Sequence, residues 1–138
     1  MGRVLAIDYG LKRTGLAVTD PLRIIATALD TVTTADLLVY LKNYCRKEQV
    51  DEMVIGMPKT LSNQESEIVP EIRKFIQLLN TEFPSVPVHE ADERFTSSIA
   101  QRAMIEGGMK KKDRQVKGTV DKISAVLILQ SFLEKRSP

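Results

Sequence analysis

The sequence contains one cysteine, one histidine and no tryptophan among its 138 residues. Because Cys45 has no partner in the chain, an internal disulfide and a structural zinc site built on several thiolates are both excluded. A Ser-His-Asp or Cys-His catalytic machine would have to use His89, which lies inside an apparent strand. A histidine packed on the sheet is the favoured interpretation of this residue. Any catalytic or binding chemistry of this protein is therefore expected to use carboxylates, lysines and arginines.

Long hydrophobic stretches are also absent. The longest apolar runs, such as residues 125–129, are far too short to span a bilayer. The first residues form a strand-like run and lack the charged start and long apolar segment of a secretory signal. With 43% hydrophobic and 28% charged residues, the composition is that of an ordinary soluble protein. We expect a single cytoplasmic domain over residues 1–138, without a membrane partner.

The net charge of +2 is small, but basic residues are concentrated in one segment. Opposed there only by Asp113, they are Lys110, Lys111, Lys112, Arg114 and Lys117. This cluster is a candidate phosphate-binding patch, and a solvated connector is an equally good interpretation of the feature alone. Since the glycines at 107–108 end one predicted helix and Thr119 begins the next, we expect a mobile loop here in the absence of substrate.

Residue periodicity predicts an α/β fold. Three stretches of period-two alternation indicate an antiparallel meander of strands: residues 3–8, 14–20 and 24–32. Helical periodicity then appears over 34–44, 65–83, 96–107 and from 119 onward. Two further strands separate these helices: residues 53–56, which are wholly apolar, and residues 86–92. Because strands that alternate with helices are joined by crossovers, we expect one mixed five-stranded sheet, a meander followed by two parallel strands, with helices on both faces.

Acidic residues close two of these strands. Asp8 ends the first strand, and Asp92 and Glu93 end the fifth. Open α/β sheets place their functional sites at the carboxyl ends of parallel strands, so these acids are expected at one edge of the sheet. Alternation places Asp92 on the face of Val88 and Glu93 on the opposite face.

A third acid falls on the terminal helix. Asp121 begins an apolar stripe that continues through Ala125, Ile128 and Phe132, so we expect it on the buried side, near the amino end of the helix. Converging carboxylates repel one another unless a cation lies between them. In a chain so poor in histidine and cysteine, Mg²⁺ or Mn²⁺ suits such oxygen ligands. Two of these ions can activate a water and stabilise the leaving oxygen of a phosphodiester.

For any one of these acids, a helix cap or a surface ion pair is the favoured interpretation. The three together, each at the end of an apolar segment, favour a metal site. Four further motifs bear on this hypothesis: residues 6–15 (AIDYGLKRTG), 55–59 (IGMPK), 92–97 (DERFTS) and 120–125 (VDKISA). In this order they resemble the motifs of the YqgF family, also called RuvX, which comprises bacterial proteins of ribonuclease H-like fold related to the RuvC resolvase. The resemblance extends from residue 3 to about residue 133.

The resemblance implies a ribonuclease H-like fold and a role in maturing the 5′ end of the 16S ribosomal RNA precursor. Its implied partners are precursor RNA and the ribosome or its assembly intermediates, and Holliday-junction resolution on DNA is an alternative. Asp8, Glu93 and Asp121 match positions taken as metal-binding and catalytic. Strand alternation favours Asp92 in place of Glu93, so both remain candidates.

Basic residues within the motifs are candidate phosphate contacts: Lys12, Arg13, Lys59 and Arg94. Arg94 can bind a phosphate with two nitrogens, or it can pair with the neighbouring acids. After Lys59 the family has a glycine-containing loop where this chain has residues 60–66, so we transfer no substrate contact to that loop.

Two rival functions belong to other classes. Residues 8–15 also resemble the phosphate loop of the actin-like sugar kinases, but those enzymes enclose ATP between two such lobes and this chain has one. We therefore expect no nucleotide binding. A non-catalytic nucleic-acid-binding module with structural carboxylates is the second rival, and binding that needs magnesium without any cleavage would support it. A resolvase normally requires a dimer with two sites, and the sequence predicts no interface.

Overall fold

The computed structural model describes residues 2–57, 68–92 and 117–136, and for residues 92, 117–122 and 136 it describes the backbone alone. The elements in these ranges are, in chain order, β1 (Arg3–Asp8), β2 (Arg13–Thr19), β3 (Ala26–Thr33), the 3-10 turn η1 (Thr34–Asp36), α1 (Leu37–Lys47), β4 (Val50–Met57), α2 (Val69–Glu82), β5 (Val88–Asp92) and α5 (Lys117–Arg136). None of the helices described is long and apolar enough to cross a membrane.

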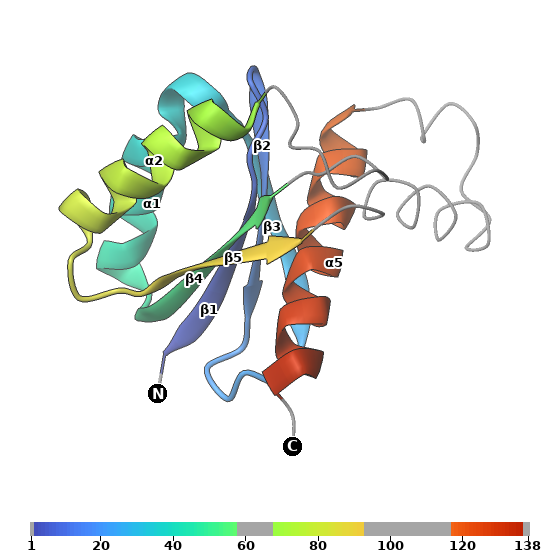
Figure 1. Ribbon diagram of the computed structural model, residues 1–138. Coiled ribbons are helices and arrows are strands. Elements are labelled where there is room, and N and C mark those ends of the chain that lie inside the picture. The colour runs from blue at the N-terminus through green and yellow to red at the C-terminus, as the bar shows by residue number, and fades with distance from the viewer. Residues whose placement is uncertain (1, 58–67, 93–116, 137–138) are drawn as a thin grey trace.

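The five strands form one mixed sheet in the order β3-β2-β1-β4-β5 (Figure 1). β1, β2 and β3 pair antiparallel, which confirms the predicted meander. β4 pairs parallel to β1, with Ile7 opposite Ile55, and β5 pairs parallel to β4, with Gly56 opposite Ala91. The parallel pairing of β1, β4 and β5 brings their carboxyl ends to one end of the sheet.

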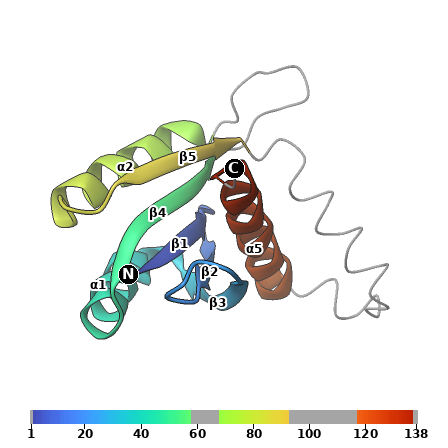
Figure 2. The same ribbon diagram turned by 90° about the horizontal axis from the view of Figure 1, so that it is seen from below.

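Alternation along β1 separates the molecule into two layers of core. Leu5 and Ile7 pack with α1 and α2 on one face of the sheet. Val4 and Ala6 pack with α5 on the other, where Ile128 is among the buried residues of that helix. Figure 2 shows α1 and α2 on one side of the sheet and α5 on the other, as the predicted architecture requires. Both faces of the central strand are therefore covered.

Several element boundaries differ from the sequence prediction for physical reasons. β3 begins at Ala26 instead of residue 24, because the backbone N–H groups of Ile24 and Ile25 donate to Oδ1 of Asp20, each at 2.8 Å. β4 spans Val50–Met57 instead of 53–56, since its polar start is paired with an arginine described below. α2 begins at Val69, and Pro70 lies in its first turn, where proline is tolerated.

The terminal helix begins at Lys117, two residues before the predicted start at Thr119. Lys117 therefore belongs to α5 and not to the basic loop. The other predicted features of this region lie outside the described residues: the helix at 96–107 and the loop residues 110–116. Of the predicted buried stripe of α5, Ala125 and Ile128 are 0% and 2% exposed, and Phe132 is partly buried against the same core.

Replacing Leu129 with alanine tests the packing of α5 on the sheet. Leu129 is fully buried among the small and branched residues of β1, β2 and β4. The cavity left by Leu129→Ala should lower the free energy of unfolding by about 2–5 kcal/mol, as measured by urea denaturation. Gln130→Ala is the matched control, because Gln130 is exposed and should cost less than about 0.5 kcal/mol. Equal effects of the two substitutions would contradict the assigned packing.

Candidate active site

Asp8 occupies the last position of β1, at the end of the sheet where β4 and β5 also finish. It follows Val4 and Ala6 in the alternation of the strand and therefore falls on the face covered by α5. Its side chain is partly buried. Whereas the preceding residues of β1 are enclosed by core on both faces, Asp8 stands where the covered part of the strand ends.

Both positions beside Asp8 in the sheet are glycines. Gly15 of β2 is directly opposite Asp8, and on the other side the pairing of Ile7 with Ile55 makes Gly56 the next residue in line. Neither neighbour adds a side chain to this face, and the next strand contributes the small residue Ala91 opposite Gly56. From the sequence alone, Gly15 suits either a tight loop whose backbone approaches a phosphate or an ordinary turn. Two glycines at strand ends are the sequence signal for the small neighbours of Asp8.

The backbone brings the other predicted carboxylate positions to the same end of the sheet. Residue 92 ends β5 and pairs with Met57, the last residue of β4. Residue 121 lies in the first turns of α5, one turn before Ala125, and the amino end of α5 lies at the end of the sheet where β1 finishes (Figure 1). The side chains of Asp92 and Asp121 and the whole of Glu93 lie outside the description. No three acidic, histidine or cysteine side chains gather as a metal site among those described.

The packing of β5 corrects one argument about the acids at its end. Val88 packs against the α1 and α2 layer. Ala91 packs against the α5 layer, and the ring of His89 lies 5.1 Å from that of Phe132 in α5. Alternation keeps Asp92 on the face of Val88, as expected, but that face is covered by α1 and α2, whereas Asp8 falls on the face covered by α5. Strand alternation therefore does not favour Asp92 as a partner of Asp8.

Of the predicted phosphate contacts, two are described together with their side chains. Lys12 and Arg13 are both exposed: Lys12 lies four residues beyond Asp8 in the turn that leads into β2, and Arg13 is the first residue of β2. The backbone of Lys117 lies in the first turn of α5. The remaining predicted contacts lie outside the described residues: Lys59, Arg94, Lys110, Lys111, Lys112 and Arg114.

The turn after Asp8 is anchored on both sides. The ring of Tyr9 lies 5.3 Å from that of Phe75 in α2, and burial together with the charge of Glu71 raises the pKa of the Tyr9 phenol. At Gly10, a β-carbon would lie 2.3 Å from the carbonyl oxygen of Arg13, a distance that no side chain can occupy. Gly10 is therefore required by the close approach of two backbone segments.

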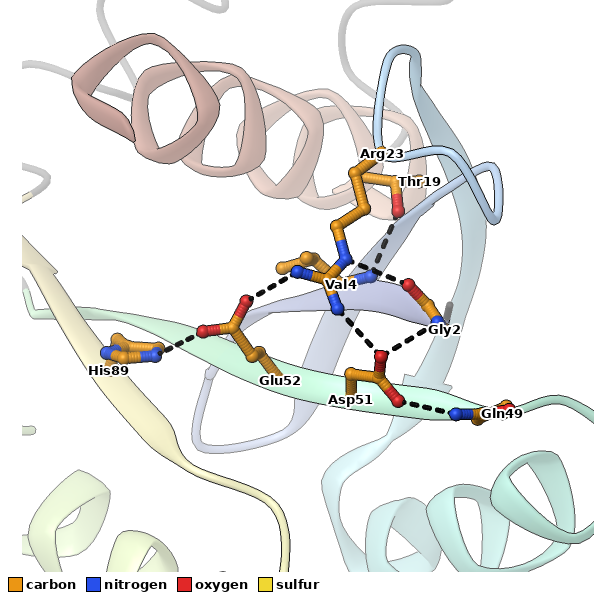
Figure 3. A network of polar contacts seen from close by, with 8 residues as sticks. All are labelled: Gly2, Val4, Thr19, Arg23, Gln49, Asp51, Glu52 and His89. Carbon is orange, nitrogen blue, oxygen red and sulfur yellow. Dashed lines mark hydrogen bonds and ion pairs between the residues drawn. The ribbon is translucent and has the colours of Figure 1, made fainter. Parts of the chain in front are cut away.

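The single histidine belongs to a different part of the molecule, at the side of the sheet where β4 begins (Figure 3). His89 Nε2 lies 3.0 Å from Glu52 Oε1, and the other oxygen of Glu52 pairs with Arg23 at 3.3 Å. Arg23 also pairs with Asp51 at 2.7 Å and donates to the carbonyl of Gly2 at 3.0 Å. These contacts tie the turn between β2 and β3 to the start of β4. The interpretation of His89 as a residue packed on the sheet is confirmed.

The chain resembles known proteins both in its fold and in its sequence. The structure of Thermus thermophilus RuvC in complex with a Holliday junction substrate superposes with a TM-score of 0.61 and 14% sequence identity, covering 99% of this chain and 96% of that one. The fold is therefore ribonuclease H-like, as predicted. A family model described as RuvX, Holliday junction resolvase, matches residues 2–135. The chain belongs to the RuvX family.

Sequence relatives agree with this assignment. A protein of Phocaeicola vulgatus is 54% identical, over 99% of this chain and 98% of its own. Relatives from Bacteroides fragilis and Porphyromonas gingivalis are 51% and 52% identical, over 99% and 97% of this chain. All three carry the provisional name of pre-16S rRNA nuclease. Membership of this family makes the chain a nuclease, a hydrolase that acts on phosphodiester bonds of nucleic acid.

Replacing Gly10 with alanine should disturb the turn that follows Asp8. The added β-carbon would meet the Arg13 carbonyl, so the two backbone segments must move apart, and we expect a loss of about 1–3 kcal/mol of folding free energy. Leu11→Ala is the neighbouring control, because Leu11 is 70% exposed and its removal should leave stability within about 0.5 kcal/mol. Thermal and urea unfolding measure both. A Gly10→Ala protein as stable as the wild type would refute the close approach.

Proposed function

We propose that this chain is a divalent-metal-dependent nuclease that hydrolyses a phosphodiester near the 5′ end of the 16S ribosomal RNA precursor in the cytoplasm. The observation that carries the proposal is the place of Asp8: a carboxylate at the carboxyl end of the central strand, on the face covered by α5, between two glycine positions. The shared name of the relatives supports the choice of RNA.

The available donor groups fit a hard divalent cation. Asp8 is joined at this end of the sheet by the backbone positions of two further acids, one at the end of β5 and one near the amino end of α5. The single histidine, His89, is engaged by Glu52, and the single cysteine, Cys45, lies in α1, so the donor groups that remain are oxygens. Asp8, Glu93 and Asp121 would hold Mg²⁺ or Mn²⁺ through oxygen ligands. A pair of such ions supplies an activated water and neutralises the leaving oxygen.

Between the two acids that close β5, we assign the ligand role to Glu93. His89 and Ala91 both contact the α5 layer, so alternate residues of β5 face the side on which Asp8 lies. In the sequence, position 93 is the next alternate residue after these two, which supports the assignment. This agrees with the family resemblance and replaces the earlier preference for Asp92.

The chain's own residues would also position the nucleic acid. Lys12 and Arg13 are exposed at the turn beside Asp8, where their charges can pair with phosphates on either side of the scissile bond. Arg94, Lys59 and the basic segment of residues 110–117 would extend this contact along the strand. Phosphate contacts of this kind hold the substrate in register and carry no sequence preference.

Holliday-junction resolution is the second candidate, favoured by the description of the family model. The two candidates differ in their substrate, RNA or a DNA junction, and in the number of active sites required, since a resolvase normally needs a dimer with two sites. A precursor RNA with an extended 5′ end and a synthetic four-way DNA junction, offered in the same buffer with Mn²⁺, distinguish them by which one is cut. Binding of either without cleavage, at any metal concentration, would favour the non-catalytic module.

Asp8→Asn separates chemistry from folding. The substitution keeps the shape of the side chain and removes the charge that holds a cation, so metal-dependent cleavage should fall by about 100-fold or more, since even residues that merely support metal ligands are worth about 10- to 100-fold. Cleavage of the precursor RNA is measured with Mg²⁺ or Mn²⁺ and with chelator. Glu82→Gln is the control, because Glu82 pairs with Lys42 at 3.1 Å in the α1 and α2 layer. Wild-type cleavage by Asp8→Asn would assign the activity to another site.

The basic segment is tested by replacing Lys110, Lys111 and Lys112 with alanine. If each lysine neutralises one phosphate, RNA affinity should weaken and the slope of log affinity against log salt should fall by roughly one per lost contact. The single-turnover rate at saturating RNA should change little, because these side chains hold the strand and not the attacking water. The matched control replaces three exposed lysines elsewhere: Lys47, Lys74 and Lys135. An unchanged affinity and salt slope in the first variant would make the segment a solvated connector.

A further inference from the structure

Two threonine hydroxyls hold the turn that follows Asp8. Thr34 Oγ1, at the start of η1, donates to the carbonyl oxygen of Gly10 at 2.6 Å. Thr14 Oγ1, in β2, lies 2.9 Å from Thr34 Oγ1 and 3.5 Å from the amide nitrogen of Gly10. Thr14 is fully buried. Both polar groups of the Gly10 backbone are therefore bonded by side chains that come from outside the turn.

The direction of each hydrogen bond follows from the number of protons. Thr34 has one hydroxyl proton, which it donates to Gly10, so the contact between the two hydroxyls requires Thr14 to be the donor. Thr14 then accepts from the Gly10 amide. The result is a closed ring of three hydrogen bonds that begins and ends on Gly10. Members of such a ring polarise one another, so removing one hydroxyl weakens the others as well.

This ring of hydrogen bonds joins segments that are far apart in the sequence. Thr34 is 24 residues beyond Gly10 and reaches it only because β3 returns alongside β2. The backbone amide of Thr34 also donates a hydrogen bond to the carbonyl of Lys12, at 2.9 Å, so Thr34 binds the turn at a second position. The segment that Thr34 binds runs from Gly10 to Lys12. Its placement sets the direction in which the chain leaves Asp8 and the position of the first basic side chain.

We propose that Thr34 is a positioning residue of the nuclease reaction: its hydroxyl holds the turn after β1 so that the Asp8 carboxylate keeps the orientation in which it binds the metal. This role rests on the proposed function of Asp8 as a metal ligand. Thr34 does not contact the reacting atoms. It acts through Gly10, in the same way that residues behind a metal ligand fix its geometry.

The test compares Thr34→Val, which removes the hydroxyl at nearly constant shape, with Thr34→Ser, which keeps it. Cleavage of the precursor RNA is followed at increasing Mn²⁺, together with RNA affinity in the absence of cleavage. In Thr34→Val we expect the Mn²⁺ concentration for half-maximal cleavage to rise about tenfold, with RNA affinity within about twofold of the wild type. Thr34→Ser should restore the wild-type metal dependence, which a role in packing alone would not require.

Thr33→Val is the matched control. Thr33 is the preceding residue, but its hydroxyl donates to Asp36 at 2.8 Å on the exposed side and does not reach the turn. Thr33→Val should therefore leave the Mn²⁺ dependence of cleavage unchanged. Thr34→Ala serves as a second hydroxyl-free variant and should show the same rise in metal requirement as Thr34→Val. Failure of both to fold, with Thr34→Ser folded, would make the role one of stability and overturn the proposal.

Asp8→Asn is assayed in parallel to separate the two proposals. If Asp8→Asn is inactive and Thr34→Val has the wild-type Mn²⁺ dependence, the positioning role is refuted and the function of Asp8 stands. If Asp8→Asn cleaves at the wild-type rate, the proposed function is refuted and the role of Thr34 falls with it. A shifted Mn²⁺ dependence in Thr34→Val that Thr34→Ser does not show supports both.

Discussion

The strand β1 is the constraint on which the rest of the structure depends. It is paired on both edges and covered on both faces, so the directions of its side chains are fixed by two cores at once. A shift by one residue would send Leu5 and Ile7 into the α5 layer and bring the small Ala6 to the side of α1 and α2, with loss of packing in both. The face of the sheet on which Asp8 lies is therefore a consequence of the four buried residues that precede it in β1.

The two ends of the sheet differ in the surroundings of their charged side chains. Where β4 begins, Arg23 is surrounded by Asp51 and Glu52, and the hydrogen bonds from Gln49, Gly2 and Arg23 lower the pKa of Asp51. Each acid there has a positive or hydrogen-bonding partner supplied by the chain, which is the arrangement of a structural network. Where β1 ends, Asp8 lies opposite Gly15, and the nearby basic residues Lys12 and Arg13 are exposed. Such an end is suited to counter-charges from outside, a cation and a polyanionic strand.

The sequence could predict what depends on local periodicity. Alternation in β1 and helical spacing in α5 give the two layers and the face of Asp8, because these patterns reflect burial directly. What it could not predict depends on contacts between distant segments. The start of β3 was misplaced because Asp20 binds the amides of Ile24 and Ile25 and so diverts an apolar run from the sheet. The choice between Asp92 and Glu93 depended on which layer Val88 joins, and two faces of similar hydrophobicity cannot be distinguished from one strand.

The turn after Asp8 shows how such distant contacts refine a site that local patterns only locate. Gly10 is needed because the Arg13 carbonyl approaches it so closely that a β-carbon would not fit, and the Gly10 amide and carbonyl are bonded by side chains. Two threonine hydroxyls supply those bonds. One is in the strand that follows the turn, and the other enters from the end of the next strand, so the turn is held only when the whole meander has formed. The geometry after Asp8 is thus coupled to the folding of β2 and β3, which links the antiparallel half of the sheet to the carboxylate at the end of its parallel half.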